Sequence, residues 1–308
     1  MKLEPFPKIF HLGTRNVRDI LTGPVEITEK LDGSQFVFGK DSDGCLHFRS
    51  KGAIIYAESA PKMFLRGVRY VESIAARLYE GGTYYCEILD SPRHNTLTYG
   101  RVPKNHLYLF GYLGFLGQLS DGLGWYGGAA LTDTARRLDI EPPNIINAGY
   151  DFSSQEIIDM VKDRESVLGK SQIEGVVVKS YKNWYWPAAD KEFGVRAAKY
   201  VTEQFKEQHR GWKKDKTSKG KLESFLSSYG TEARWEKARQ YLEEQDMLEG
   251  EPRDIGQLVK RVQQDVMEES EDDIRDWLWN NFKGDIKRRS VKGLPEWYKR
   301  KLALGGGA

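Results

Sequence analysis

The chain has 308 residues, of which 39% are hydrophobic and 30% charged, a composition that excludes a largely disordered protein. Its 47 basic and 45 acidic residues give a formal net charge of only +2, which by itself gives no indication of a polyanionic partner. Two cysteines, Cys45 and Cys86, are too few for a disulfide-rich fold or a zinc site, and the five histidines lack metal-ligand spacing.

No stretch of the chain approaches the roughly 18 consecutive apolar residues of a membrane span. The first ten residues, MKLEPFPKIF, lack the apolar run and cleavage site of a signal peptide. We therefore expect a cytoplasmic protein. At this length the chain is expected to hold two domains.

Aromatic and β-branched runs bounded by turn residues predict five strands in the first two thirds of the chain, at residues 35–39, 46–49, 83–89, 107–113 and 175–179. DSDG at 41–44 predicts a hairpin turn between the first two strands. Helices are predicted at 71–80 and 153–164, and in the second Ser153 and Glu156 can form a capping box. Because long βαβ units are scarce, the pattern favours an α+β fold with antiparallel sheets.

Beyond about residue 203 the pattern becomes helical and strongly charged. Residues 206–221 hold seven basic and two acidic residues and predict an exposed basic linker. Later apolar residues recur at helical spacing, namely Ile255, Leu258, Val259, Val262 and Val266. We therefore predict domains at 1–205 and 222–303, the second a small helical bundle.

The sequence EKLDGSQF at 29–36 places Lys30 two residues before an Asp-Gly turn. A lysine acts as a nucleophile when its pKa is lowered from about 10.4, so that a neutral fraction exists. By itself the motif is equally compatible with a solvated lysine beside a β-turn.

Five further motifs follow Lys30 in order: FRSKG (48–52), YYCEILDSP (84–92), LYLFG (107–111), IEGVVVK (173–179) and RAAKY (196–200). This ordered series resembles the nucleotidyltransferase motifs of the covalent lysyl-adenylate ligase superfamily, over about residues 25–205. The superfamily includes RNA ligases, DNA ligases and capping guanylyltransferases. The chain is most similar to the RNA ligase 2 type, because a helical region and no strand-rich OB-fold follows the motifs.

The resemblance implies an α+β adenylyltransferase domain followed by a helical RNA-binding domain. It implies an ATP-dependent RNA ligase that uses Mg²⁺ or Mn²⁺ and joins 3′-OH and 5′-phosphate RNA ends at duplex nicks, through lysyl-AMP and RNA-adenylate intermediates. A monomer from a bacterium or a phage-infected host cell is expected. The alternatives are a DNA nick ligase, a capping guanylyltransferase, or a protein that holds RNA ends without sealing them.

The same resemblance implies roles for individual residues. Lys30 is the expected nucleophile, Glu174, Lys179 and Lys199 are expected to assist it, and Glu174 is also the expected metal contact. The implied nucleotide-binding residues are Glu29, Asp32, Gly33, Gln35, Arg49, Lys51, Glu87, Phe110, Glu174, Lys179 and Lys199.

Some of these roles can be described further. Phe110 would stack on adenine, and Glu87 would accept a hydrogen bond from the ribose, on the strand face opposite Cys86 and Ile88. Arg49 and Lys51 compete for one phosphate contact, which the planar fork of arginine favours.

Two positions depart from the family pattern. Gly111 stands where the family commonly has Asp, and Ala197 stands where the first lysine of the last motif is expected. Arg196 is the candidate replacement for that lysine. Cationic Lys179 and Lys199 are expected to lower the pKa of Lys30.

The expected nucleic-acid contacts are Arg93, Arg101, Lys213, Lys214, Lys287, Arg288 and Arg289. Residues 283–301 hold eight basic and two acidic residues, whereas residues 241–273 hold three basic and twelve acidic ones. The net charge of +2 is therefore a cancellation between separate patches, and screening over about 8–10 Å makes each patch act locally. We expect RNA binding that weakens with salt. The C-terminal tryptophans, by their helical spacing, are more typical of core packing.

Overall fold

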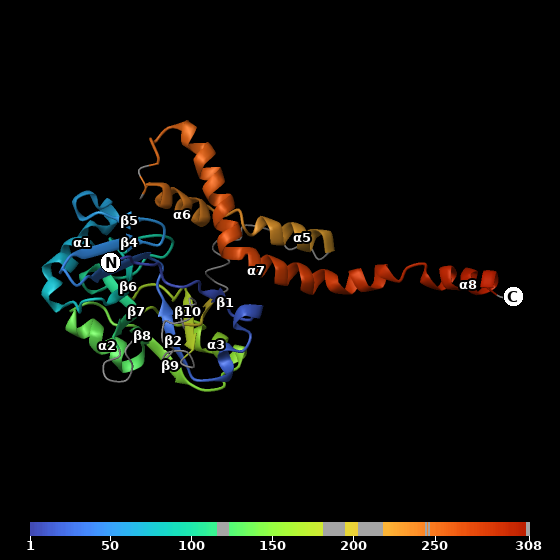
Figure 1. The fold of residues 1–308 in the computed structure, drawn as a ribbon, viewed down its shortest axis with the longest axis horizontal. Helices are drawn as coiled ribbons and strands as arrows, with labels where there is room; N and C mark the ends of the chain where they lie inside the picture. Colours follow the sequence, from blue (N-terminus) through green and yellow to red (C-terminus); the bar gives the residue numbers. More distant parts are fainter. Residues whose placement is uncertain (116–122, 181–194, 203–217, 244, 246, 306–308) are drawn as a thin grey trace. The chain divides into compact units, whose positions relative to one another are not determined.

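A computed structural model describes residues 1–115, 123–180, 195–202, 218–243, 245 and 247–305 (Figure 1). The chain divides into two compact units, Met1–Gln263 and Gln264–Ala308. The first unit holds both β-sheets, and the boundary between the units lies within a long helix.

Five strands form the first sheet. In spatial order they are β1 (Phe10–His11), β11 (Ala197–Val201), β10 (Gly175–Ser180), β2 (Val25–Lys30) and β9 (Ile145–Gly149). Neighbours are antiparallel except for β1 and β11, which are parallel. Strand β2 ends at Lys30, so the predicted nucleophile lies at the end of an interior strand.

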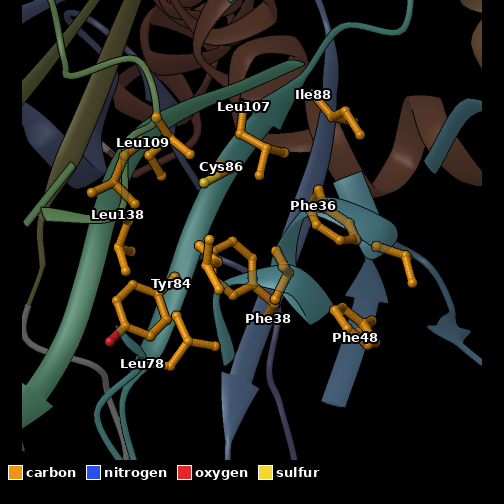
Figure 2. Packing of buried hydrophobic residues seen from close by; sticks show 14 of the residues in the cluster. Phe36, Phe38, Phe48, Leu78, Tyr84, Cys86, Ile88, Leu107, Leu109 and Leu138 are labelled. Atoms are coloured by element: carbon orange, nitrogen blue, oxygen red, sulfur yellow. The ribbon is translucent and has the colours of Figure 1, made fainter. Parts of the chain in front are cut away.

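Six antiparallel strands form the second sheet. In spatial order they are β5 (Ile54–Ile55), β4 (Leu46–Ser50), β3 (Ser34–Lys40), β6 (Thr83–Ile88), β7 (Leu107–Phe115) and β8 (Leu123–Tyr126). One face of this sheet carries a large apolar cluster, in which Phe36, Phe38 and Tyr84 point the same way (Figure 2). Helices α1 (Lys62–Ser73) and α2 (Gly128–Arg137) contribute to this cluster and cover that face.

The opposite face of the second sheet packs against the first sheet. Val37, Tyr85 and Trp125 of the second sheet form one buried cluster with Val177 and Ala197 of the first. Because successive residues of a strand point to opposite faces, Val176 and Val178 belong instead to the outer cluster of the first sheet. Helix α3 (Ser154–Val161) covers that outer face.

Several predicted elements are confirmed. The five predicted strands correspond to β3, β4, β6, β7 and β10. The turn at 41–44 closes with a backbone hydrogen bond from Gly44 N to Asp41 O of 3.1 Å.

The helix predicted at 71–80 is wrong in position. Helix α1 runs from Lys62 to Ser73, because Phe64, Val68 and Val71 form the apolar face that packs on the sheet. Strand β2 escaped prediction because its sequence, VEITEK, places charged side chains on both faces of the strand.

The C-terminal region is helical, which confirms the predicted α+β class with antiparallel sheets and a helical C-terminal region. Its helices are α5 (Ser218–Ser227), α6 (Glu232–Glu243), α7 (Ile255–Ser290) and α8 (Leu294–Gly305). Residues 218–221 of the predicted linker belong to α5, whereas 206–217 lie outside the described residues. The predicted domain limits, 1–205 and 222–303, differ from the division at Gln263 and stay a prediction.

The core packing expected for the C-terminal tryptophans is wrong for three of them. The exposed fractions are 52% for Trp235, 61% for Trp279 and 49% for Trp297. Of the predicted apolar face of α7, Ile255 (60%) and Val259 (49%) are exposed, whereas Leu258, Val262 and Val266 are half-buried. None of the described helices combines the length and the apolar character needed to cross a membrane.

Helix α3 offers a test of local stability. The Ser153 hydroxyl accepts a hydrogen bond from Glu156 N (3.2 Å), and the Glu156 carboxylate accepts one from Ser153 N (2.7 Å), which confirms the predicted capping box. Ser153→Ala should lower the free energy of unfolding by about 1 kcal/mol, because helix donors lose their acceptor. Urea denaturation measures this loss. Ser154→Ala is the control, and an equal loss in that variant would contradict the prediction.

Candidate active site

Two motifs far apart in the sequence meet at Lys30. The register between β2 and β10 places Lys30 opposite Gly175, and Glu174 immediately precedes β10. The Lys30 Nζ and Glu174 Oε2 atoms lie 2.6 Å apart. Gly175 is required here, because a Cβ atom would lie 2.0 Å from the Tyr200 carbonyl oxygen of the neighbouring strand. The glycine thus keeps β10 and β11 close where Glu174 enters the site.

Glu87 joins this pair from the second sheet. Its Oε1 accepts a hydrogen bond of 3.1 Å from Gly33 N. Cys86 and Ile88 are fully buried in the cluster on the other face, which confirms the predicted alternation along β6. A Cβ atom at Gly33 would lie 2.8 Å from the Glu87 Cγ and 2.7 Å from the Ile88 carbonyl oxygen. A glycine at position 33 therefore lets the turn after Lys30 approach Glu87.

The electrostatics around Lys30 differ from the prediction. Burial alone would lower the pKa of Lys30, but the carboxylates of Glu174 and Glu87 outweigh burial and raise that pKa above its ordinary value. The expected lowering of this pKa by Lys179 and Lys199 is therefore wrong. Burial also raises the pKa of Glu174, and it raises the pKa of Glu87 to about 7.

The carboxylates around Lys30 could supply one or two of the ligands of a divalent cation. Asp32, Glu87 and Glu174 lie near one ammonium group, and each of these acidic groups acts on the Lys30 pKa. Carboxylate oxygens are the ligands that Mg²⁺ prefers, usually one or two of them together with water and phosphate oxygens. Among the described residues, no three His, Cys, Asp or Glu side chains are arranged to hold a metal. A cation at Glu174 would need water or phosphate ligands.

The Asp32 carboxylate binds the chain's own backbone. Its Oδ2 accepts hydrogen bonds from Thr96 N (2.7 Å) and Leu97 N (2.9 Å). Asn95 Nδ2 donates to the Gly33 carbonyl oxygen at 2.7 Å, so the loop at 92–106 is fastened to the turn after Lys30. The side chain of Asp32 therefore anchors a loop, and its predicted nucleotide contact has no support from this geometry.

Backbone atoms of the N-terminal segment, Leu3–Phe6, bind two of the side chains predicted to contact the nucleotide. Nothing in the sequence indicated this role for the segment. The Gln35 Oε1 atom accepts a hydrogen bond from Phe6 N (3.1 Å). The Arg49 Nη1 atom donates to the Leu3 carbonyl oxygen (2.7 Å). Lys51, the alternative to Arg49, is exposed just beyond the end of β4. The described Gln35 and Arg49 side chains thus bind the chain's own backbone.

Phe6 also explains the unusual glycine at 111. The Phe6 ring packs edge-on against Phe110, with centroids 5.1 Å apart, and against Trp125, with centroids 5.2 Å apart. A Cβ atom at Gly111 would lie 3.0 Å from the Phe6 Cε2. Phe6 fills the space that a side chain at position 111 would need, so the expected Asp cannot be accommodated without a shift.

Lys179 and Lys199, the lysines of the last two motifs, lie at different distances from Lys30 along the first sheet. Lys199 pairs with Val177 in the register and belongs to the strand face of Ala197, toward the second sheet. Lys199 acts on the pKa of Glu174 and counteracts its rise. Lys179 is instead buried beside Glu26, and its predicted phosphate contact has no geometric support here.

Two further predictions are corrected by strand alternation. Arg196 lies on the outer face, where its guanidinium binds Asp19 Oδ1 (2.5 Å), so it does not replace the lysine missing at Ala197. The Glu29 side chain also points away from Lys30. Its carboxylate accepts hydrogen bonds from Ser166 Oγ (2.5 Å), Asn144 Nδ2 (2.8 Å) and Val167 N (3.0 Å). These three donors make Glu29 an anchor of the surrounding loops.

The predicted nucleic-acid residues are dispersed. Arg101 pairs with both carboxylate oxygens of Glu141 at 2.8 Å, and Arg93 is exposed in the same loop. Lys213 and Lys214 lie outside the described residues. Three exposed cations, Lys287, Arg288 and Arg289, lie in the last turn of α7, in the second unit.

Comparison with known protein families identifies the family of this chain. A sequence model of the RNA ligase family matches residues 23–201, more than half of the chain. The chain therefore belongs to the RNA ligase family. Comparison with curated proteins gives no match.

Solved structures with a similar fold include three of Naegleria gruberi RNA ligase. An apo mutant is 16% identical (TM-score 0.46), the enzyme with pyrophosphate 15% (0.47), and a mutant with AMP and manganese 14% (0.45). The alignments cover 67–68% of this chain and 60–65% of those chains. The chain thus spans less than two thirds of their length.

The raised pKa of Glu87 predicts a pH-dependent stability. Between the ordinary carboxyl pKa and about 7 the folded protein binds more protons at Glu87 than the unfolded chain does, so stability falls as pH rises through this window. Glu87→Gln removes the free-energy cost of ionising this buried carboxyl and keeps an oxygen that accepts from Gly33 N. The variant should exceed the wild type at pH 8 by about 1–3 kcal/mol in free energy of unfolding, and by less at pH 5.

Urea denaturation at both pH values measures this difference. The exposed Glu72→Gln is the matched control. A Glu87→Gln variant that loses stability equally at pH 5 and pH 8 would contradict the assignment.

Proposed function

We propose that this protein is an ATP-dependent RNA ligase that joins 3′-OH and 5′-phosphate RNA ends, with Lys30 as the adenylylated residue. The observation that carries the proposal is the 2.6 Å contact between Lys30 and Glu174, with Glu87 held beside them by the backbone of Gly33. Membership of the RNA ligase family supports both the ligase activity and an RNA substrate.

In the first step Lys30 attacks the α-phosphate of ATP. The Nζ must first lose a proton, and the Glu174 carboxylate lies within reach to accept it. The new P–N bond forms as the bond to pyrophosphate breaks. A divalent cation would neutralise charge that develops on the phosphate oxygens. The raised pKa of Lys30 opposes this deprotonation, and neutralisation of the surrounding carboxylates would favour it.

In the next steps AMP passes from Lys30 to the RNA 5′-phosphate, and the Nζ is released. The RNA 3′-OH then attacks that phosphate, a phosphodiester bond forms and AMP leaves. Lys199 is the proposed phosphate contact, because it lies on the face toward the second sheet and near Glu174. Phosphoryl transfer needs such cations to balance charge on the equatorial oxygens.

Two further binding roles are proposed for residues of the second sheet. Glu87 is the proposed acceptor for the ribose hydroxyl, and Phe110 is the proposed adenine-stacking ring. The Gln35 Oε1 and Arg49 Nη1 atoms can turn to substrate by releasing Phe6 N and the Leu3 carbonyl oxygen. A rearrangement of the N-terminal segment is thus proposed to free these two atoms for a nucleotide or an RNA end.

A covalent labelling experiment tests the proposal directly. Incubation with a divalent cation and α-labelled ATP should label the wild type and leave Lys30→Ala at background, because only Lys30 presents the nucleophilic amine. Lys2→Ala, whose side chain is 89% exposed, is the matched control and should be labelled like the wild type.

Each other outcome points to an alternative. Absence of a Lys30-dependent adduct would remove the ligase proposal and favour a protein that holds RNA ends. An adduct with GTP in place of ATP would favour a capping enzyme. Sealing of nicked DNA in preference to nicked duplex or single-stranded RNA would favour a DNA ligase.

The exposed cations of α7 give a second prediction. Replacing Lys287, Arg288 and Arg289 by Gln should weaken binding to duplex RNA. It should also reduce the slope of log K against log salt by up to about 2–3, because fewer counterions are released. Fluorescence anisotropy at 50–200 mM salt measures both quantities. Lysyl-AMP formation serves as the control and should be unchanged, and an unchanged salt slope would rule out these three residues as phosphate contacts.

A further inference from the structure

Lys179 occupies an unusual place for a lysine. Its side chain is only 3% exposed, and its Nζ donates a hydrogen bond of 2.6 Å to the carbonyl oxygen of Phe110. The nearest acidic atom is Glu26 Oε1, at 3.8 Å. A buried ammonium needs an opposite charge and hydrogen-bond acceptors, and this site supplies both from other strands.

Phe110 is available for this bond because it lies at a β-bulge. Tyr85 pairs with Gly111 and Cys86 with Leu109, so Phe110 is the extra residue of β7 in its pairing with β6. A bulge leaves its extra residue outside the regular ladder and re-aims its side chain. The ammonium of Lys179 thus binds the backbone of the residue whose ring faces Phe6 and the space between the sheets.

Glu26 is fixed as firmly as Lys179. Its side chain is fully buried, and its Oε2 accepts a hydrogen bond of 2.6 Å from Gly128 N, in the first turn of α2. A carboxylate at a helix N-terminus is stabilised by the helix dipole. Glu26, Lys179 and Phe110 therefore form a buried chain of contacts that joins the first sheet, the second sheet and α2.

The register separates Lys179 from the site of the proposed chemistry. Lys179 lies opposite Glu26, four residues along β2 from Lys30, which corresponds to roughly 13 Å at 3.3 Å per residue. Lys199 lies opposite Val177, which in turn lies opposite Thr28, two residues from Lys30. Of these two lysines, Lys199 is the one nearer to Lys30 in the register of the sheet.

We infer that Lys179 is a positioning residue held by Glu26. It fixes the backbone of Phe110 and thereby orients the ring proposed to stack on adenine. The inference rests on the proposed function for the role of Phe110, but the buried pair itself can be tested without activity. It departs from the phosphate contact expected for this lysine.

Removing the charge of Lys179, of Glu26 or of both distinguishes a positioning role of Lys179 from a direct phosphate contact. Lys179→Met alone leaves the Glu26 carboxylate buried without its cation, which is strongly destabilising, whereas removal of both charges is tolerated far better. The variants are Lys179→Met, Glu26→Gln and the double variant. Lys199→Met, with and without Glu26→Gln, is the matched control. The measurements are thermal unfolding and the kcat and KM(ATP) of lysyl-AMP formation.

A positioning role predicts a specific pattern. Lys179→Met should lower the unfolding midpoint by several degrees and raise KM(ATP) at least tenfold with a smaller change in kcat. Adding Glu26→Gln should restore the unfolding midpoint, because no buried charge is then left unpaired. KM(ATP) should stay raised with kcat little changed, because the Phe110 carbonyl oxygen still lacks its donor. Adding Glu26→Gln to Lys199→Met should restore neither the unfolding midpoint nor the kcat of lysyl-AMP formation.

A phosphate contact predicts the opposite pattern. The double variant would then lose kcat as severely as Lys179→Met, and this outcome would overturn the inference. If Lys179→Met does not fold, the double variant alone decides between the two results. If the wild type forms no lysyl-AMP, the proposed function fails. The unfolding midpoints still test the pair, and a double variant no more stable than Lys179→Met would overturn it.

Discussion

A strand can present only every second side chain to the space between two packed sheets, and this alternation determines the chemistry available to this protein. Along β2 it directs Glu26 and Lys30 toward the second sheet and Glu29 away from it. Along β11 it directs Ala197 and Lys199 inward and leaves Arg196 outside. The inner positions of β2 and β10 are uncharged in the middle, at Thr28 and Val177. Charged pairs lie on either side, Lys30 with Glu174 and Lys179 with Glu26.

Much of the fold was accessible from sequence, because its strands are aromatic and β-branched where they are fully buried. The runs around Phe36, Tyr84 and Val177 were predicted for this reason. Strand β2 was not, because its inward positions carry charge, and a strand with glutamate on both faces has no clear hydrophobic period. The charged residues of β2, which include the predicted nucleophile Lys30, are therefore the reason that this strand could not be predicted from its hydrophobic pattern.

The sequence predicted which residues belong to the candidate site better than it predicted what each of their side chains binds. The motifs indicated Lys30, Glu87 and Glu174, and the structure brings these three together. The partners of Gln35 and Arg49 depend on Leu3–Phe6, which carries no motif and comes from a distant part of the sequence. Periodicity cannot reveal such a long-range contact, and the glycine at 111 was seen from sequence only as a departure from the family pattern.

The fastening of the 92–106 loop by Asp32 changes how loss-of-function variants of this chain are to be interpreted. An alanine at Asp32 removes the acceptor of two backbone N–H groups, at Thr96 and Leu97, and so frees a loop that also carries His94 and Asn95. Activity lost in such a variant would then reflect an altered loop, even with every reacting atom intact. Chemical rescue with small carboxylates, or an asparagine at the same position, would separate a structural role from a nucleotide contact at a residue that the motif resemblance alone counts as nucleotide-binding.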